Sequence, residues 1–168
     1  MWEFFFIMFI FHIQKINIIR GAIVYSVFDA IAALMLGQFS WIRFFGIMII
    51  GATIYTFEIP NYFVWIEQKC QKFSGHKQKI IKTLYALLFF NPLWIARHLL
   101  FIDLLTLGNS SFSILMIALK SFVVNIPISL FANYFIQNKL NLGYRYLASA
   151  LFSGLMAIYY AYSKTLFA

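Results

Sequence analysis

Charged residues are scarce in this chain, and so is cysteine. Charged side chains make up 11% of the 168 residues, against about 25% in a typical soluble domain. The single cysteine, Cys70, excludes an internal disulfide and any zinc or iron–sulfur site built from several cysteines. Residues 1–7 have neither the positive start and small-residue cleavage site of a secretory signal nor the Arg and Ser of a mitochondrial presequence. We therefore expect no cleavable leader.

Motifs of catalysis are missing as well. The sequence has no glycine-rich phosphate loop, no nucleophile elbow and no His/Glu pair at metal-ligand spacing. A haem held by two histidines needs imidazoles at matched depth, and His12 and His98 belong to different depths of the predicted bundle. The sequence therefore predicts a protein that is not an enzyme and that uses no metal or cofactor.

What the chain has instead is long apolar runs. Hydrophobic residues make up 63%, and a membrane-spanning helix needs about 20 predominantly apolar residues. The runs are continuous, whereas strands of a membrane β-barrel alternate in polarity. The sequence predicts an all-α, polytopic transmembrane helix bundle of about five spans, with residues 15–168 as a single domain and residues 1–14 as a short interfacial helix. The predicted spans are 16–37, 41–66, 81–104, 111–137 and 145–163.

The basic residues are distributed unevenly across this topology. When the spans alternate in direction, nine of the 13 basic residues lie at one surface of the membrane, which we call the basic end. Such a bias is typical of the cytoplasmic or matrix side. These nine residues are Lys15, Arg20, Lys69, Lys72, Lys77, Lys79, Lys82, Lys139 and Arg145.

Lipid is the partner that this basic end indicates. Because the lysines flank bilayer-length apolar segments, a nucleic-acid surface is excluded. Lys69, Lys72, Lys77 and Lys79 are candidates for binding cardiolipin head groups. The alternative is that these four lysines only set the orientation of the chain.

Ionisable side chains within the spans form the candidate site. Counted along their helices, Asp29, Arg97 and Lys120 lie about 20, 22 and 25 Å from the basic end. Charged groups at such depth face protein or water. We therefore predict an intramembrane cluster in which Asp29 pairs with Arg97 and Lys120 lies nearby. A sealed junction between helices is the favoured interpretation, and a polar cavity is the alternative.

A second buried acid lies beside a proline. Glu58 precedes Pro60 by two residues, and a proline inside a helix removes a backbone hydrogen bond and favours a kink. The carboxylate could bind a cation or gate a pore there. A salt bridge from Glu58 to Arg20 or Arg145 is the favoured alternative. Pro92 and Pro127 predict similar kinks that aid packing.

Small residues recur every fourth position in the first and last predicted spans. This spacing lets helix backbones approach closely, which drives helix association in lipid. We expect both stripes at helix–helix contacts. They are Ala22, Ser26 and Ala30 in the first span, and Ser149, Ser153, Ala157 and Ala161 in the last.

The polar landmarks of residues 12–162 recur in an order and at spacings that resemble one family. They are His12 to Lys15 followed by Asp29, Arg43 with Gly51, Tyr62-Phe63 with Ile66-Glu67, Lys82 with Phe90-Asn91-Pro92, Pro127 with Asn133-Tyr134, and Tyr144-Arg145. In this pattern the chain is similar to the Mpv/PMP family, which includes Mpv-seventeen and the small peroxisomal membrane proteins. The resemblance implies a small multi-pass protein of the mitochondrial inner membrane or, alternatively, of the peroxisomal or another organelle membrane.

The chain departs from this family at polar positions within the helices. Where the family has Gly-Pro, Asp-Gln, Trp and Trp-Asn, this chain has Thr56-Phe57, Ala86-Leu87, Ile126 and Met156-Ala157. Apolar replacements of this kind favour a non-enzymatic accessory subunit that packs into a larger respiratory-chain or ATP-synthase assembly. The alternative that stays open is a channel for small solutes or ions, as proposed for the family.

Overall fold

The computed structural model describes residues 14–107 and 112–167, and all of its elements within these ranges are helical. The predicted interfacial helix at residues 1–14 lies almost wholly outside the described part. In chain order the elements are α2 (Lys15–Met35), α3 (Trp41–Ile50), η1 (Gly51–Tyr55), α4 (Thr56–Cys70), α5 (Gly75–Leu84), η2 (Tyr85–Phe90), α6 (Asn91–Leu107), α7 (Ser113–Lys139) and α8 (Leu142–Phe167), where η1 and η2 are π-helical.

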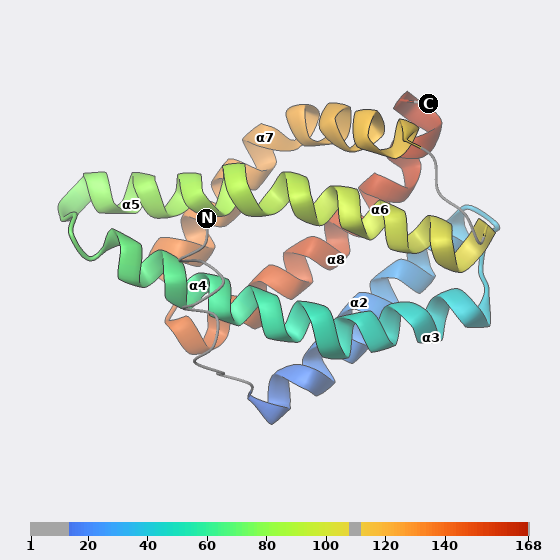
Figure 1. Ribbon diagram of the computed structural model, residues 1–168, viewed down its shortest axis with the longest axis horizontal. Helices are drawn as coiled ribbons and strands as arrows, with labels where there is room; N and C mark the ends of the chain where they lie inside the picture. The colour runs from blue at the N-terminus through green and yellow to red at the C-terminus, as the bar shows by residue number, and fades with distance from the viewer. Residues whose placement is uncertain (1–13, 108–111, 168) are drawn as a thin grey trace.

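These elements join into five long rods that alternate in direction (Figure 1). The segments α3, η1 and α4 form one continuous rod, and α5, η2 and α6 form another. Within the described residues, four rods are long and apolar enough to cross a membrane: Lys15–Met35, Trp41–Cys70, Gly75–Thr106 and Ser113–Lys139. The all-α prediction is confirmed. The fifth span stays a prediction, because α8 has the length but is not among the four.

The rods are joined by short turns with a clear local cause. After α2, Gly37 adopts a positive φ of 64°, which a residue without Cβ tolerates. The Ser40 side chain then accepts a hydrogen bond from the Arg43 backbone N–H and caps α3. The second and third predicted spans leave a loop at residues 67–80. In the structure this connection is shorter, because only the turn at residues 71–74 separates α4 from α5, which begins at Gly75.

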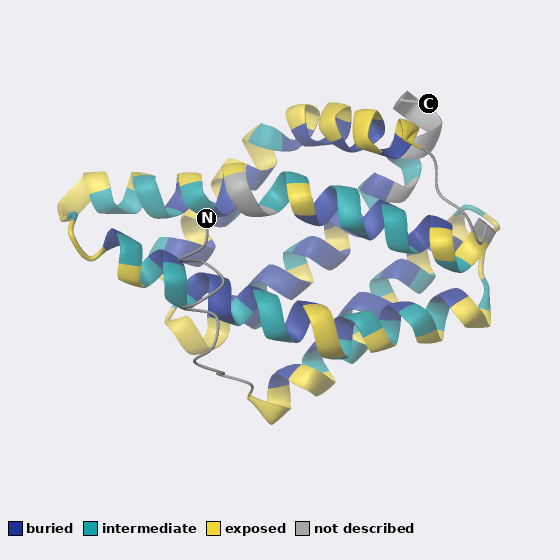
Figure 2. Ribbon diagram, in the orientation of Figure 1, coloured by how far each residue is buried: buried dark blue, intermediate teal, exposed yellow. Residues whose placement is uncertain are grey.

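Polar side chains point inward and large apolar ones point outward. Ile19, Ile23 and Leu34 of α2 are exposed, whereas Asn17 and Ser26 of the same helix are buried. Figure 2 shows the buried residues on the faces that neighbouring helices share. Lipid can cover an apolar surface but cannot hydrogen-bond to a polar one. This distribution therefore fits a bundle that stands in a membrane.

The two small-residue stripes lie on α2 and α8, two helices that contact each other. Helices α2 and α8 share the most extensive contact of the fold. Ser26, Ser153 and Ala157 are all buried, as expected of residues that line such a contact. Gly154 shows how tight this contact is, because a Cβ there would lie 2.6 Å from the Phe28 ring. These four-residue stripes therefore fit the expected helix contacts at Ser26, Ser149, Ser153 and Ala157, whereas Ala22 and Ala30 are only half-buried.

Candidate functional site

The intramembrane carboxylate Asp29 pairs with Arg43, not with Arg97. Arg43 Nε and Nη2 donate to the two carboxylate oxygens of Asp29 at 2.7 Å each. The Asp29 and Arg43 side chains are 1% and 2% exposed. Asp29 lies on α2 and Arg43 on α3, so the pair closes the hairpin formed by these two helices. A two-pronged arginine–carboxylate pair of this geometry is among the strongest ionic contacts in proteins.

An aromatic layer surrounds this pair on the side of α6. His98 Nε2 lies 3.9 Å from Asp29 Oδ1, and His98 Nδ1 lies 3.3 Å from the Tyr55 hydroxyl oxygen. The indole of Trp94 stacks on the His98 ring, with centroids 4.8 Å apart and planes 10° apart. Asp29, Arg43, Tyr55 and His98 are therefore one contiguous polar cluster that joins three of the five rods.

Arg97 pairs instead with the second buried acid, Glu58. Arg97 Nη2 and Glu58 Oε2 lie 2.7 Å apart and connect α6 to α4. Both side chains remain partly exposed, Arg97 by 31% and Glu58 by 22%. The predicted partners of Glu58 were therefore wrong, because Arg20 donates to Asn17 and Arg145 contacts Glu67.

Lys120 is not part of either ion pair. It is exposed on α7, while Asp29 pairs with Arg43 and lies 3.9 Å from His98 Nε2. The predicted cluster is therefore divided in the structure. Asp29 and Arg97 belong to two separate ion pairs, and Lys120 lies on another helix. Depth along a helix was a correct reason to expect partners for these charges, but it did not give the direction in which each side chain points.

A third ionic contact lies at the basic end. Glu67 of α4 contacts Lys82 of α5 at 2.6 Å and also Arg145 at the start of α8. The Arg145 guanidinium further donates to the Leu140 carbonyl oxygen at 3.0 Å and lies 3.5 Å from Gln137 Oε1. One carboxylate therefore ties together three rods at the membrane surface.

A polar stripe on α7 was missed at the sequence level. Its members recur at every fourth position and are all buried, so they face the rest of the bundle. Asn125 Nδ2 donates to Ser129 Oγ at 2.7 Å and to the Tyr160 hydroxyl at 2.8 Å. The regular spacing was a usable signal. The stripe consists of Ser121, Asn125, Ser129, Asn133 and Gln137.

The predicted head-group lysines surround the turn between α4 and α5. Lys72 and Lys77 lie over the Phe73 ring, with their ammonium nitrogens 5.2 and 5.1 Å from its centroid. Lys69 is in the last turn of α4, and Lys79 is in α5. The structure therefore places all four lysines at one tip of the molecule, on the left in Figure 1.

Grooves on the bundle surface are lined mostly by apolar side chains. Three of these grooves measure about 490, 460 and 410 Å³, and none of the three is lined by Asp29, Arg43, Tyr55 or His98. Arg97 lines the 410 Å³ groove between α6 and the start of α7. Across the described residues, no three metal-ligating side chains lie close enough together to hold an ion.

Comparisons with protein-family models, with curated proteins and with solved structures give no match for this chain. The class of protein is therefore defined by the fold alone. The chain is an all-helical protein whose apolar rods are suited to a membrane.

Proposed function

We propose that this chain is a non-enzymatic accessory subunit of a larger assembly in the mitochondrial inner membrane, such as a respiratory-chain or ATP-synthase complex. The observation that carries the proposal is the Glu58–Arg97 pair. The two atoms in contact, Glu58 Oε2 and Arg97 Nη2, are buried, whereas the rest of both side chains is partly exposed and Arg97 lines an apolar groove on the outside of the bundle. Ions that face hydrocarbon are costly, so a neighbouring chain with polar groups is the natural cover for them.

The Mpv/PMP resemblance supports the fold that this proposal assumes. Several landmarks that carry it contact one another, although they are far apart in sequence: Asp29 pairs with Arg43, and Glu67 binds both Lys82 and Arg145. Contacts between matching landmarks are what a shared fold requires. The polar positions where the chain departs from the family include Ala86, which is buried and apolar here.

A channel for small solutes or ions is the second candidate. The same Arg97 groove favours it, since a charged side chain at depth can also line a water-filled path. Against this candidate, the Asp29–Arg43 pair is sealed and satisfies both charges within the protein. A sealed pair leaves no free charge for a passing ion.

Extraction of native membranes in mild detergent distinguishes the two functions. As an accessory subunit, this 19.7 kDa chain co-migrates with a large complex on native gels. Replacing both Glu58 and Arg97 by Gln weakens that co-migration. The control is Lys15→Gln with Lys139→Gln, which changes two exposed charges at the basic end. Migration as a free monomer, together with solute flux into liposomes that contain only this chain, would support the channel instead.

A further inference from the structure

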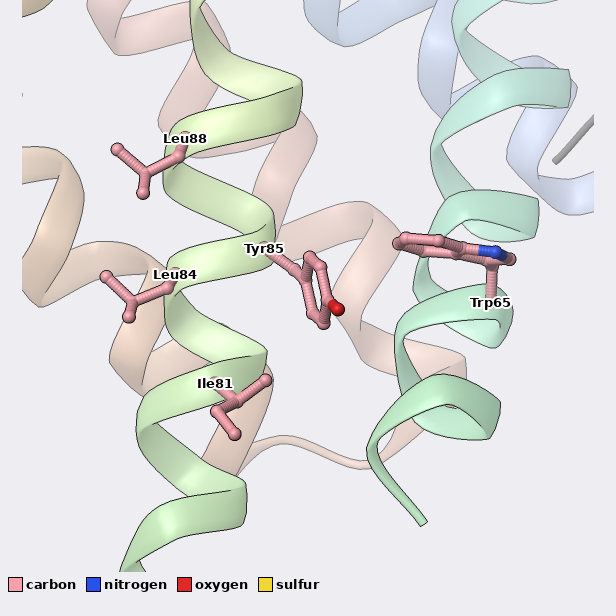
Figure 3. A pocket seen from close by; sticks show the side chains of 5 residues that line it. All are labelled: Trp65, Ile81, Leu84, Tyr85 and Leu88. Carbon is pink, nitrogen blue, oxygen red and sulfur yellow. The ribbon is translucent and has the colours of Figure 1, made fainter. Parts of the chain in front are cut away.

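An apolar groove runs between α4 and the rod formed by α5 and η2. Its volume is about 460 Å³, and its lining residues are Trp65, Ile81, Leu84, Tyr85 and Leu88. Figure 3 shows Tyr85 and Trp65 extending toward each other across the space between the two helices, with the leucines along the other side of their rod. The volume falls within the range of about 300–1,000 Å³ that is typical of ligand pockets.

The width of the groove is fixed by contacts between aromatic residues. The Tyr62 hydroxyl of α4 donates to the Tyr85 carbonyl oxygen at 2.7 Å, which ties α4 to the first residue of η2. Trp65 stacks on Tyr62 and meets Tyr85 edge-on, with centroids 5.4 and 5.3 Å apart. The shape of the groove is therefore set by the contacts that hold α4 against η2.

The distance from the basic turn to the far end of the groove matches one leaflet of a bilayer. From Lys77 in the first turn of α5 to Leu88 in η2 is 11 residues, or about 16 Å of helix. Half of a hydrocarbon core about 30 Å thick is about 15 Å. A chain that enters the groove at the basic end and reaches Leu88 has therefore crossed one leaflet.

Positive charge lies at the mouth of this groove. Lys77 precedes the lining residue Ile81 by one helical turn, and Lys69 follows Trp65 by one turn, so each lies on the same helix face as its lining residue. Lys72 and Lys77 are exposed and hold their ammonium groups over Phe73. The nearby acid Glu67 is already engaged by Lys82 and Arg145.

We propose that this groove binds one phospholipid with an anionic head group, taken from the leaflet at the basic end. One acyl chain lies along the outer surface of α4 and η2, over Trp65, Tyr85 and Leu88, and the phosphate lies at Lys72 and Lys77. Charge complementarity at the mouth and an apolar lining that ends one leaflet from the basic turn select this occupant over a zwitterionic lipid or a polar solute. The site does not depend on the accessory-subunit function.

Quenching of tryptophan fluorescence by brominated lipids tests the site. The purified chain is reconstituted in phosphatidylcholine vesicles that contain a fixed fraction of brominated phosphatidylglycerol or of brominated phosphatidylcholine. The contribution of Trp65 is the difference between the wild type and Trp65→Phe. We expect this contribution to be quenched preferentially by the anionic lipid, and native mass spectrometry of the wild type to show one retained anionic phospholipid.

Replacing the lysines at the mouth measures their role. Lys72→Gln with Lys77→Gln should lower the preference for anionic lipid by about five-fold for each lysine, since one lysine near an anionic surface contributes about 1 kcal/mol. The control pair is Lys15→Gln with Lys139→Gln, which removes the same charge from the same end but away from the groove.

Two results would overturn the proposal. Equal quenching of the Trp65 contribution by both brominated lipids would show that the groove holds no preferred lipid. Equal loss of preference in the two lysine pairs would show that only the general charge of the basic end attracts anionic lipid. The four substituted lysines are all exposed, so the substitutions leave the helix contacts in place, and circular dichroism checks this. They are Lys15, Lys72, Lys77 and Lys139.

Discussion

Of the ion pairs that connect helices in the described part of this bundle, Asp29–Arg43 is sealed inside it and Glu58–Arg97 is open at its surface. Asp29 and Arg43 meet through two hydrogen bonds, and water or lipid reaches almost none of their surface. Glu58 and Arg97 meet through a single close contact, and between a fifth and a third of each side chain is exposed. Both pairs satisfy buried charge, but only the sealed pair is fully compensated by its own chain.

This difference assigns the two pairs different roles. A fully buried pair is costly to break, because removal of one partner leaves the other as an uncompensated charge. It therefore holds α2 against α3. A partly open pair is cheaper to break, and its remaining surface is available to a neighbouring chain or to solvent. The open pair is thus the ion pair at which we expect a neighbouring chain to make contact.

The largest expected effect comes from breaking the sealed pair. Arg43→Met leaves the Asp29 carboxylate buried without a cationic partner, and His98 Nε2 at 3.9 Å is only a polar neighbour. We expect a loss of about 3–5 kcal/mol in the free energy of unfolding. The measurement is unfolding of the purified protein in mixed detergent micelles as the fraction of denaturing detergent rises.

The double variant Asp29→Leu with Arg43→Met serves as the control for that prediction. It removes both charges, so most of the lost stability should return. If the single Arg43 variant lost less than about 1 kcal/mol, the pair would not be the structural tie that its burial indicates.

The tight crossing of α2 and η1 should give the next largest effect. A Cβ added at Gly51 would lie 2.5 Å from the Gly21 carbonyl oxygen, which is backbone and cannot rotate away. Gly51→Ala therefore separates the two elements, and we expect a cost of about 1–3 kcal/mol in the same unfolding assay. Gly143→Ala is the matched control, because nothing lies within 4 Å of a Cβ there. Equal effects of the two substitutions would contradict a close approach at Gly51.

Breaking the open pair should cost less. In Arg97→Gln the Glu58 carboxylate keeps part of its exposure, so the lost attraction is offset by solvation. We expect about 1 kcal/mol or less in unfolding, together with the weaker co-migration described above. A stability loss as large as that of Arg43→Met would remove the distinction between the two pairs.

Much of this fold follows from the sequence, because the length of a span and the charge of a loop depend only on the order of residues along the chain. The apolar runs predicted the rods, four of which are long and apolar enough to span a membrane, and the small-residue stripes predicted close helix contacts without saying which helices meet. The ends of the rods were less exact, since α5 extends the third rod back to Gly75 where a loop was predicted. A helix rich in polar and basic residues, such as α5, lacks the continuous apolar run that marks a span.

The pairing of the charges could not be predicted in the same way. Residues at equal depth on two helices meet only if both side chains face the same interface. Depth along a helix does not give the direction in which a side chain points around the helix axis. Arg43 was close to Asp29 along the hairpin, on the far side of the turn at Gly37, and its long side chain reaches back to the carboxylate. The helix that follows α2 in the chain is therefore the first place to expect a partner for Asp29.

The smallest expected effect concerns the polar stripe of α7. Asn125→Leu removes the hydrogen bonds to Ser129 and Tyr160, and bonds of this kind between membrane helices average about 0.6 kcal/mol. Within the described residues Asn125 Oδ1 has no partner, so the substitution also removes an unsatisfied buried acceptor and offsets part of the loss. We therefore expect at most about 0.6 kcal/mol in the unfolding assay, close to the result for the exposed control Val124→Ala. A loss near that of Arg43→Met would mean that the stripe, rather than the sealed ion pair, holds the bundle together.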